Sequence, residues 1–136
     1  MIFALCGYHN SGKTTLGTFL VRKLKALGYK VAVVKATKEE GELTDRPDSD
    51  TFRYRESGSD IVSLFQKTLL TIYVKEIPSN KEDFLQFLQR LFWEKDLILL
   101  EGFKSFPEIP KIWVLREEDK EEELKACYSE IELFVK

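Results

Sequence analysis

The stretch Gly7-Tyr8-His9-Asn10-Ser11-Gly12-Lys13-Thr14 lies between an apolar run, Ile2–Cys6, and a segment with helical periodicity. It fits the pattern G-x-x-x-x-G-K-[ST], in which a glycine-rich turn presents successive backbone N–H groups to phosphate oxygens. In such a loop Lys13 reaches the outer phosphates as a point charge, and Thr14 offers its hydroxyl to magnesium. A strand before the motif and a helix after it are the context that the pattern requires, so the sequence predicts a phosphate-binding loop rather than an ordinary turn with an incidental lysine.

Short apolar runs and helical patterns alternate along the chain, and this alternation predicts the fold. Strands are expected at Ile2–Cys6, Lys30–Val34, Asp60–Phe65, Leu69–Val74, Leu97–Leu100, Ile112–Leu115 and Ile131–Val135. Helices are expected at Lys13–Leu27 with Gly28 as its stop, at Ser49–Ser57, after a capping Ser79, and at Glu117–Tyr128. Such alternation is typical of an α/β three-layer sandwich with a mostly parallel sheet. Together with the loop, it predicts one P-loop NTPase domain over residues 1–136, in which residues 60–74 can form a hairpin.

The overall composition excludes several classes of protein. The formal net charge of -2 lacks the basic excess of a duplex-binding protein, so we expect no nucleic-acid partner. The apolar run after Met1 has no basic flank and is too short to span a bilayer, so we expect no membrane partner. Cys6 and Cys127 offer neither a disulfide framework nor a Cys-x-x-Cys pair. We therefore expect a cytoplasmic protein.

Two acidic residues follow predicted strands and are candidates for contacting the nucleotide. Glu101 ends the apolar run that begins at Leu97, where an acid can hold magnesium directly or through water; the alternative is a solvated acid at a strand end. Asp119 follows the strand Ile112–Leu115, and we hypothesise that it accepts hydrogen bonds from a guanine edge. A second match to a guanine signature, Asn80-Lys81-Glu82-Asp83, overlaps the capping box Ser79-x-x-Glu82, so we interpret it as a helix start.

The polar segment from about Thr37 to Asp50 has no hydrophobic period. Its carboxylates, Asp45, Asp48 and Asp50, are placed to position a water or a metal if the segment faces the nucleotide, and Arg53 or Arg55 would then offset phosphate charge. The alternative is an acidic surface loop. The residues alone leave both interpretations open.

Three blocks of the sequence, in the same order, resemble the molybdopterin-guanine dinucleotide biosynthesis protein B (MobB) family. The first is the loop with Thr15 and Leu16 after it. The second is Asp45-Arg46-Pro47 with Asp50-Thr51, Arg53 and Glu56-Ser57-Gly58-Ser59. The third is Glu101-Gly102-Phe103-Lys104 with Pro110-Lys111-Ile112 and Arg116. Each block alone is weak, but the ordered set covers the chain from its start to about Arg116.

The resemblance implies a homodimeric GTP-binding protein with slow hydrolysis. Its role would be to assist a MobA-like guanylyltransferase that joins GMP to molybdopterin, and molybdopterin itself is a possible ligand. By motif matching, residues 7–15 bind nucleotide and magnesium, with Lys13 and Asp50 as catalytic positions and Thr14 and Glu101 near the metal. Lys104 and Arg116 match family positions to which we assign no role.

The sequence also departs from the family pattern. Ala36 and Thr37 stand where family members usually carry histidines, and Asp48-Ser49 replaces a Gly-Lys pair. These departures affect substrate handling more than nucleotide binding. Two other functions stay open, a small P-loop kinase and a regulatory module that holds nucleotide without turnover, although an arginine-rich lid is not apparent between Lys67 and Glu94.

Overall fold

The computed structural model describes residues 1–37, 49–106, 108–127 and 131–134. The predicted loop residues Asp45 and Asp48 lie outside this part of the chain. The chain divides into two compact units, the first formed by Met1–Lys38 with Phe92–Lys136 and the second by Glu39–Leu91. The single-domain organisation stays a prediction.

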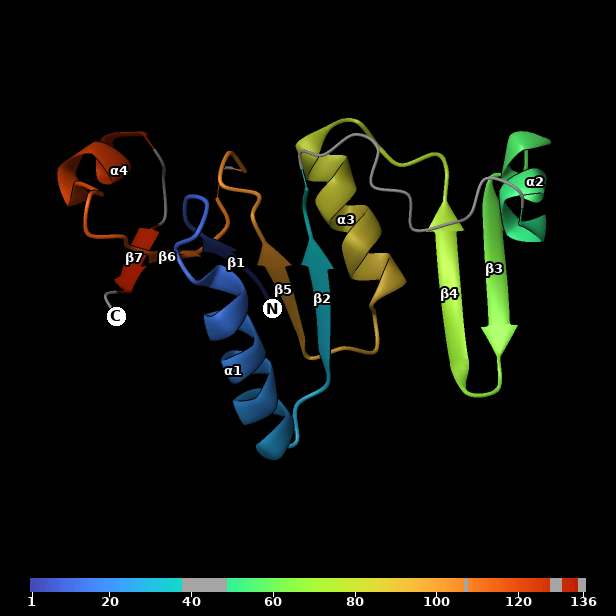
Figure 1. The fold of residues 1–136 in the computed structure, drawn as a ribbon, viewed down its shortest axis with the longest axis horizontal. Helices are drawn as coiled ribbons and strands as arrows, with labels where there is room; N and C mark the ends of the chain where they lie inside the picture. Colours follow the sequence, from blue (N-terminus) through green and yellow to red (C-terminus); the bar gives the residue numbers. More distant parts are fainter. Residues whose placement is uncertain (38–48, 107, 128–130, 135–136) are drawn as a thin grey trace. The chain divides into compact units, whose positions relative to one another are not determined.

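A five-stranded sheet forms the centre of the first unit (Figure 1). In chain order the elements of this unit are β1 (Ile2–Cys6), α1 (Lys13–Ala26), β2 (Val31–Lys35), β5 (Leu97–Glu101), β6 (Lys111–Val114), α4 (Glu121–Cys127) and β7 (Ile131–Phe134). The strand order is β2-β5-β1-β6-β7, and every pairing in the sheet is parallel. The predicted α/β fold with a parallel sheet is therefore confirmed.

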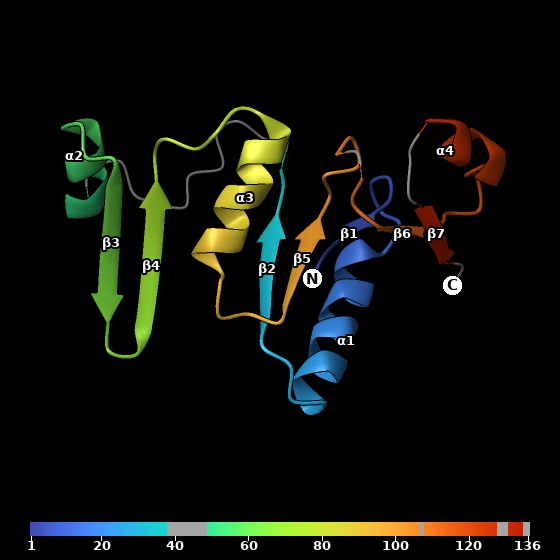
Figure 2. The same ribbon diagram turned by 180° about the vertical axis from the view of Figure 1, so that it is seen from behind.

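The core of the first unit lies between this sheet and α1. Leu5, Leu99 and Val114 are almost fully buried and form one cluster, which shows why the strands read as continuous apolar runs. Helix α1 contacts β1, β2 and β5 (Figures 1 and 2). A Cβ atom on Gly17 would lie 3.3 Å from a methyl group of Leu5, so this glycine permits the close approach of helix and sheet.

Helix α1 ends as the sequence predicts. Gly28 adopts a left-handed φ of 90°, and its N–H donates to the carbonyl of Lys25. The N–H of Tyr29 donates to the carbonyl of Leu24, which completes a Schellman motif. The chain then turns directly into β2.

The second unit contains α2 (Asp50–Glu56), β3 (Ile61–Gln66), β4 (Leu69–Val74) and α3 (Lys81–Leu91). Strands β3 and β4 form an antiparallel hairpin that is a separate two-stranded sheet, as the sequence suggested. Lys67, at the turn, has a φ of 49°. Ser49 caps α2 by accepting a hydrogen bond from the N–H of Phe52.

The expected capping box at the start of α3 is wrong by one residue. The side-chain oxygen of Asn80, not of Ser79, accepts hydrogen bonds from the N–H groups of Glu82 (2.9 Å) and Asp83 (3.2 Å). Asn80 is as good an N-cap residue as serine, and the motif cannot tell which of two neighbouring polar residues is the cap. Because its oxygen is occupied in this way, Asn80 marks a helix start, which agrees with our interpretation of the Asn80–Asp83 segment.

No helix within the described ranges is long and apolar enough to cross a membrane.

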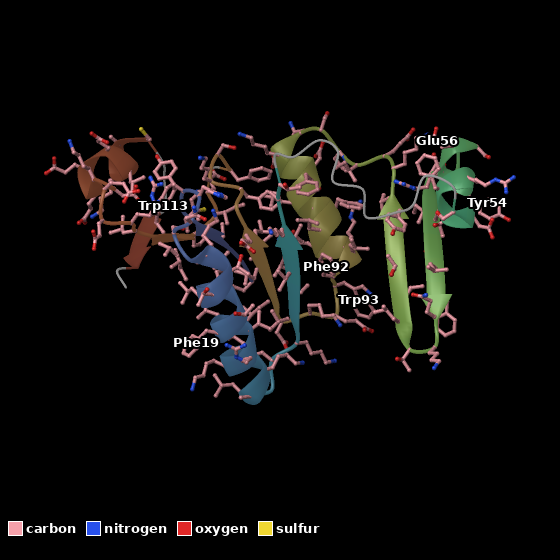
Figure 3. The ribbon with its side chains drawn as sticks, in the orientation of Figure 1. Phe19, Tyr54, Glu56, Phe92, Trp93 and Trp113 are labelled. Atoms are coloured by element: carbon pink, nitrogen blue, oxygen red, sulfur yellow. The ribbon has the colours of Figure 1, made fainter. Side chains whose placement is uncertain are left out.

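Large side chains of the two units differ widely in solvent exposure, as Trp113 of β6 and Tyr54 of α2 illustrate (Figure 3). Trp113 is completely buried, whereas Tyr54 is 66% exposed.

We expect Asn80→Ala to lower the free energy of unfolding by about 1 kcal/mol, because two N–H groups at the start of α3 lose their acceptor. Ser79→Ala is the matched control, and its effect should stay within a few tenths of a kcal/mol. Urea unfolding of the two variants measures both values. A larger loss in the serine variant would return the cap to Ser79.

Candidate nucleotide-binding site

The predicted phosphate-binding loop leaves the carboxyl end of β1, in the middle of the sheet. Strand β1 lies between β5 and β6, and all three run parallel. Their carboxyl ends therefore meet at one edge, which is where ligands bind in open parallel sheets. This arrangement brings the residues after β5 and after β6 to the two sides of the loop.

Glycine is required at both ends of the loop. A Cβ atom on Gly7 would lie 2.5 Å from Ser11 Oγ and 3.0 Å from the carbonyl oxygen of Val114. Gly12 has a left-handed φ of 95° and is the N-cap residue of α1. Any side chain at Gly7 would therefore distort the turn, and any at Gly12 would strain it.

The start of α1 keeps its backbone donors unused by side chains. Gly12 supplies no capping side chain, and the first turn of the helix contains no acidic residue. The first N–H groups of a helix have no intrahelical acceptor and carry its positive dipole end. A helix start of this kind suits a ligand that brings negatively charged acceptors.

Ser11 provides a second indication that the loop fits an anionic group. Ser11 is 3% exposed, and its Oγ atom has no hydrogen-bond partner among the described residues. A buried hydroxyl without a partner costs stability, and such groups occur where a ligand or water supplies the missing contact. The loop therefore fits phosphate in its donors as well as in its sequence.

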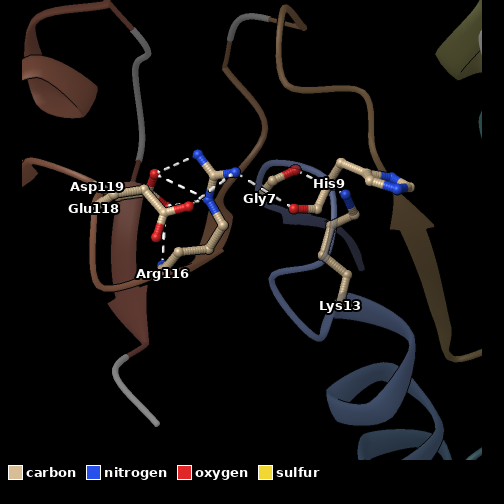
Figure 4. Close-up of polar contacts among 6 residues, drawn as sticks. All are labelled: Gly7, His9, Lys13, Arg116, Glu118 and Asp119. Atoms are coloured by element: carbon tan, nitrogen blue, oxygen red, sulfur yellow. Dashed lines mark hydrogen bonds and ion pairs between the residues drawn. The ribbon is translucent and has the colours of Figure 1, made fainter.

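Lys13 lies across the loop. Its Nζ atom donates a hydrogen bond of 2.7 Å to the carbonyl oxygen of Gly7, as Figure 4 shows. This contact holds the ammonium group at the mouth of the loop, where the sequence places a phosphate-binding cation. The neighbouring loop residues His9 and Asn10 are exposed, and so is Thr15 in the first turn of α1.

The structure brings Thr14 and Glu101 together, although 87 residues separate them in sequence. The Thr14 hydroxyl donates a hydrogen bond of 2.7 Å to Oε1 of Glu101, at the carboxyl end of β5. A hydroxyl and a carboxylate oxygen are suitable neighbours for Mg²⁺, which prefers oxygen ligands and retains several waters. In the described part of the chain, no three His, Cys, Asp or Glu side chains form a metal cluster. A magnesium here would therefore depend on phosphate oxygens, Thr14 and water, with Glu101 close by.

The ion pair between Arg116 and Asp119, which follow β6, lies on the other side of the loop. Arg116 donates to Asp119 through Nη2 (2.8 Å) and Nε (3.2 Å), and its backbone N–H donates to Oδ2 of the same carboxylate (2.9 Å) (Figure 4). The hydrogen bonds from Arg116 lower the pKa of Asp119 against the opposing effect of desolvation. Nη1 of Arg116 also contacts the carbonyl oxygen of His9 at 3.4 Å, so the pair supports the loop.

This arrangement gives Asp119 a structural task that sequence reasoning missed. The Asp119 side chain is 3% exposed, and both of its oxygens accept bonds from Arg116. The spacing Arg116-x-x-Asp119 is the only sequence signal of this pair, and it is a weak one. The guanine contact of Asp119 stays a prediction, and it requires the carboxylate to share its oxygens with Arg116 or to leave it.

Asp50, the other predicted catalytic residue, is the first residue of α2 in the second unit. It provides a carboxylate in the first turn of that helix, where a negative charge is favourable. Its catalytic role stays a prediction.

A hollow of about 340 Å³ lies between α1 and the sheet, beside Thr14 and Glu101. Most of its lining is apolar, with Leu5, Val21 and Leu99 among its walls. Phosphate groups require donors and positive charge, and the loop fits them better than this hollow does.

Comparison with known proteins identifies relatives along almost the whole chain. The family model described as molybdopterin guanine dinucleotide synthesis protein B matches residues 2–136. The chain is 36% identical to the molybdopterin-guanine dinucleotide biosynthesis adapter protein of Escherichia coli, over 85% of this chain and 66% of that protein. It is 35% identical to the adapter protein of the same name from Haemophilus influenzae, over 86% of this chain and 64% of that protein. The chain thus spans slightly less than two thirds of the length of these two curated relatives.

A solved structure has the same fold. The crystal structure of Bacillus subtilis MobB superimposes with a TM-score of 0.73 at 26% identity, over 98% of this chain and 78% of that chain. The two chains therefore share the overall α/β fold of the P-loop type.

We expect Asp119→Asn to lower the melting temperature at neutral pH, because the buried carboxylate loses its charge beside Arg116. A carboxylate with a lowered pKa in the folded state stabilises the protein above its ordinary value of 3.8, and this contribution disappears as the pH falls through the lowered pKa. The melting curves of wild type and variant should therefore converge on acidification, which calorimetry from pH 7 to pH 3 measures. A difference that does not change with pH would exclude the ion pair as its cause.

Proposed function

Because the chain belongs to the family of molybdopterin guanine dinucleotide synthesis protein B, we propose that it is a GTP-binding accessory protein of molybdenum cofactor biosynthesis. In this role it assists the formation of molybdopterin guanine dinucleotide and has at most a slow GTPase activity. The observation that carries the proposal is the phosphate-binding loop, with Lys13 across it and Thr14 bonded to Glu101 beside it. The names of the relatives indicate the pathway.

The residues of the loop divide the work of holding a Mg²⁺–nucleotide complex. The backbone N–H groups at the start of α1 and the Ser11 hydroxyl donate to phosphate oxygens. Lys13 adds a positive charge there, and magnesium would supply a further positive charge to the outer phosphates. Thr14 contributes a ligand to the metal, and Glu101 orients the metal's water shell.

The preference for guanine rests on the family and on the predicted contact of Asp119. The proposed partner is a guanylyltransferase of the MobA type, to which the chain would supply nucleotide, with molybdopterin as a possible second ligand. The word adapter in the relatives' names supports an assisting role over a catalytic one.

We expect GTP with magnesium to bind at least about tenfold more tightly than ATP in calorimetric titration. Lys13→Ala should weaken GTP binding by roughly 10- to 100-fold, because a charge-assisted contact to phosphate is lost. Lys25→Ala, at the opposite end of α1, is the matched control, since it removes the same charge away from the loop.

Two outcomes would contradict the proposal. Equal or tighter binding of ATP would remove the guanine assignment and favour a small P-loop kinase. Full GTP affinity in the Lys13 variant would show that the nucleotide binds elsewhere.

We also propose that the hairpin β3–β4 joins two copies of the chain. In the antiparallel register Phe65 lies opposite Leu70 and Ile61 opposite Val74, so these side chains share one face with Ile72. Four of them are exposed by about half or more: Ile61 (58%), Phe65 (74%), Leu70 (54%) and Ile72 (47%). A contiguous apolar face of this kind is typical of an interaction surface, and a two-fold axis can pair it with itself.

We expect the wild-type protein to sediment as a dimer and Phe65→Lys to shift it toward the monomer, because a lysine would be buried in the apolar contact. Thr71→Lys places the same charge on the opposite face of the hairpin and should leave the dimer intact. Analytical ultracentrifugation distinguishes the three proteins. A monomeric wild type, or a dimer that persists in the Phe65→Lys variant, would contradict this interface.

A further inference from the structure

Two cations contact the ring of Tyr8, the second residue of the phosphate-binding loop. Nζ of Lys104 lies 4.9 Å from the ring centroid, and Cζ of Arg116 lies at the same distance. The ring also makes a T-shaped contact with the ring of Trp113, with 5.4 Å between centroids. These contacts place two positive side chains from opposite sides of β1 against the loop, one following β5 and the other following β6.

The two cations differ in how their charge is balanced. Arg116 pairs with Asp119 at 2.8 Å and with Glu118 at 3.3 Å, so it contributes little net charge to the loop. Lys104 has no carboxylate partner among the described residues, and its side chain is partly buried. An ammonium group in this position strengthens any interaction with an anion that arrives at the loop.

The backbone that carries Lys104 is held in an unusual conformation. Gly102 has a φ of 100° and Phe103 a φ of 57°, so two consecutive residues are left-handed. A non-glycine residue in this region costs stability, and such strain is concentrated at functional sites. Strand β1 holds this turn through two hydrogen bonds. The N–H of Gly102 donates to the carbonyl of Leu5, and the Cys6 thiol donates to the carbonyl of Gly102.

Lys13 and Lys104 both lie near the end of β1, where the loop begins. Burial raises the pKa of the Cys6 thiol to about 11, against the opposing positive charges of Lys111, Lys13 and Lys104. Cys6 directly precedes the loop. Lys13 Nζ bonds to the Gly7 carbonyl oxygen and Lys104 Nζ contacts the Tyr8 ring, so both ammonium groups lie beside the start of the loop.

The position of Lys104 after Glu101 indicates which phosphate it faces. Glu101 contacts Thr14, the proposed ligand of the magnesium, and Lys104 follows Glu101 by three residues on the same turn. In P-loop sites the metal bridges the two outer phosphates. The side of the loop next to Glu101 is therefore the side of the outer phosphates.

We propose that Lys104 is a second phosphate-binding cation of this site, which contacts the terminal phosphate of a nucleoside triphosphate. This inference rests on the proposed nucleotide-binding function. It adds a residue that distinguishes a nucleoside triphosphate from a diphosphate. The Tyr8 ring holds the ammonium group in place before the nucleotide arrives, so little side-chain entropy is lost on binding. Arg116 is a positioning residue, because its charge is already paired and it supports the loop through His9 and Tyr8.

The test compares binding of GTP and GDP, each with magnesium, by calorimetry. Lys104→Met should weaken GTP binding by about tenfold and GDP binding by less than about threefold, because the diphosphate lacks the group that Lys104 contacts. Lys104→Arg should restore most of the preference for the triphosphate. Lys25→Met is the matched control and should change neither affinity.

The ratio of triphosphate to diphosphate affinity separates this inference from the proposed function. Equal losses for GTP and GDP in Lys104→Met, or no loss for either, would overturn the role of Lys104 and leave GTP binding intact. A preference for ATP would overturn the guanine assignment, and the same ratio measured with ATP and ADP would still test Lys104. A wild type that binds neither triphosphate would contradict both.

Discussion

The hydrogen-bonded ladder that holds β1 between β5 and β6 is the constraint on which the site depends. Leu5 is in register with Glu101 on one side and with Ile112 on the other. Because the three strands are parallel, the loop after β1 emerges between the residues that follow its two neighbours. Glu101 and Arg116 flank the loop for this reason, although neither is near it in sequence. A change in register would separate the carboxylate from the hydroxyl of Thr14.

Charge within the site follows from this placement. Asp119 is paired with Arg116, whereas the carboxylate of Glu101 contacts the first turn of α1 through the Thr14 hydroxyl, and that turn itself contains no acidic residue. Lys13 bonds to a backbone carbonyl and not to an acid. The loop therefore presents backbone donors and the ammonium group of Lys13, an arrangement that becomes favourable when an anion is bound.

The sequence predicted the positions of most strands and helices, but it missed the capping residue of α3, the start of α4 and the contacts of Lys104. The loop, the strands and the Gly28 stop follow from spacing and from glycine conformation, so the sequence was sufficient. The helix expected from Glu117 begins only at Glu121, because Asp119 bonds back to the N–H of Arg116 and its own N–H donates to the Arg116 carbonyl. A side chain that competes with the helix in this way is not visible in a pattern of apolar residues. The position of Lys104 over Tyr8 likewise requires the fold.

The buried apolar side chains are distributed unevenly between the two units. This difference is relevant to the proposed assignment of nucleotide binding to the first unit and association to the second. Among the described residues of the second unit, Val62 and Leu88 are the buried hydrophobic side chains, whereas the first unit buries most of three strands. A two-stranded hairpin with so small a core is marginal on its own. Helix α2 adds contacts to β3 within the same unit, and the proposed pairing of two hairpins would add more on the exposed apolar face. The residues proposed to hold phosphate all belong to the first unit, so substitutions on the hairpin face can test association separately from nucleotide binding.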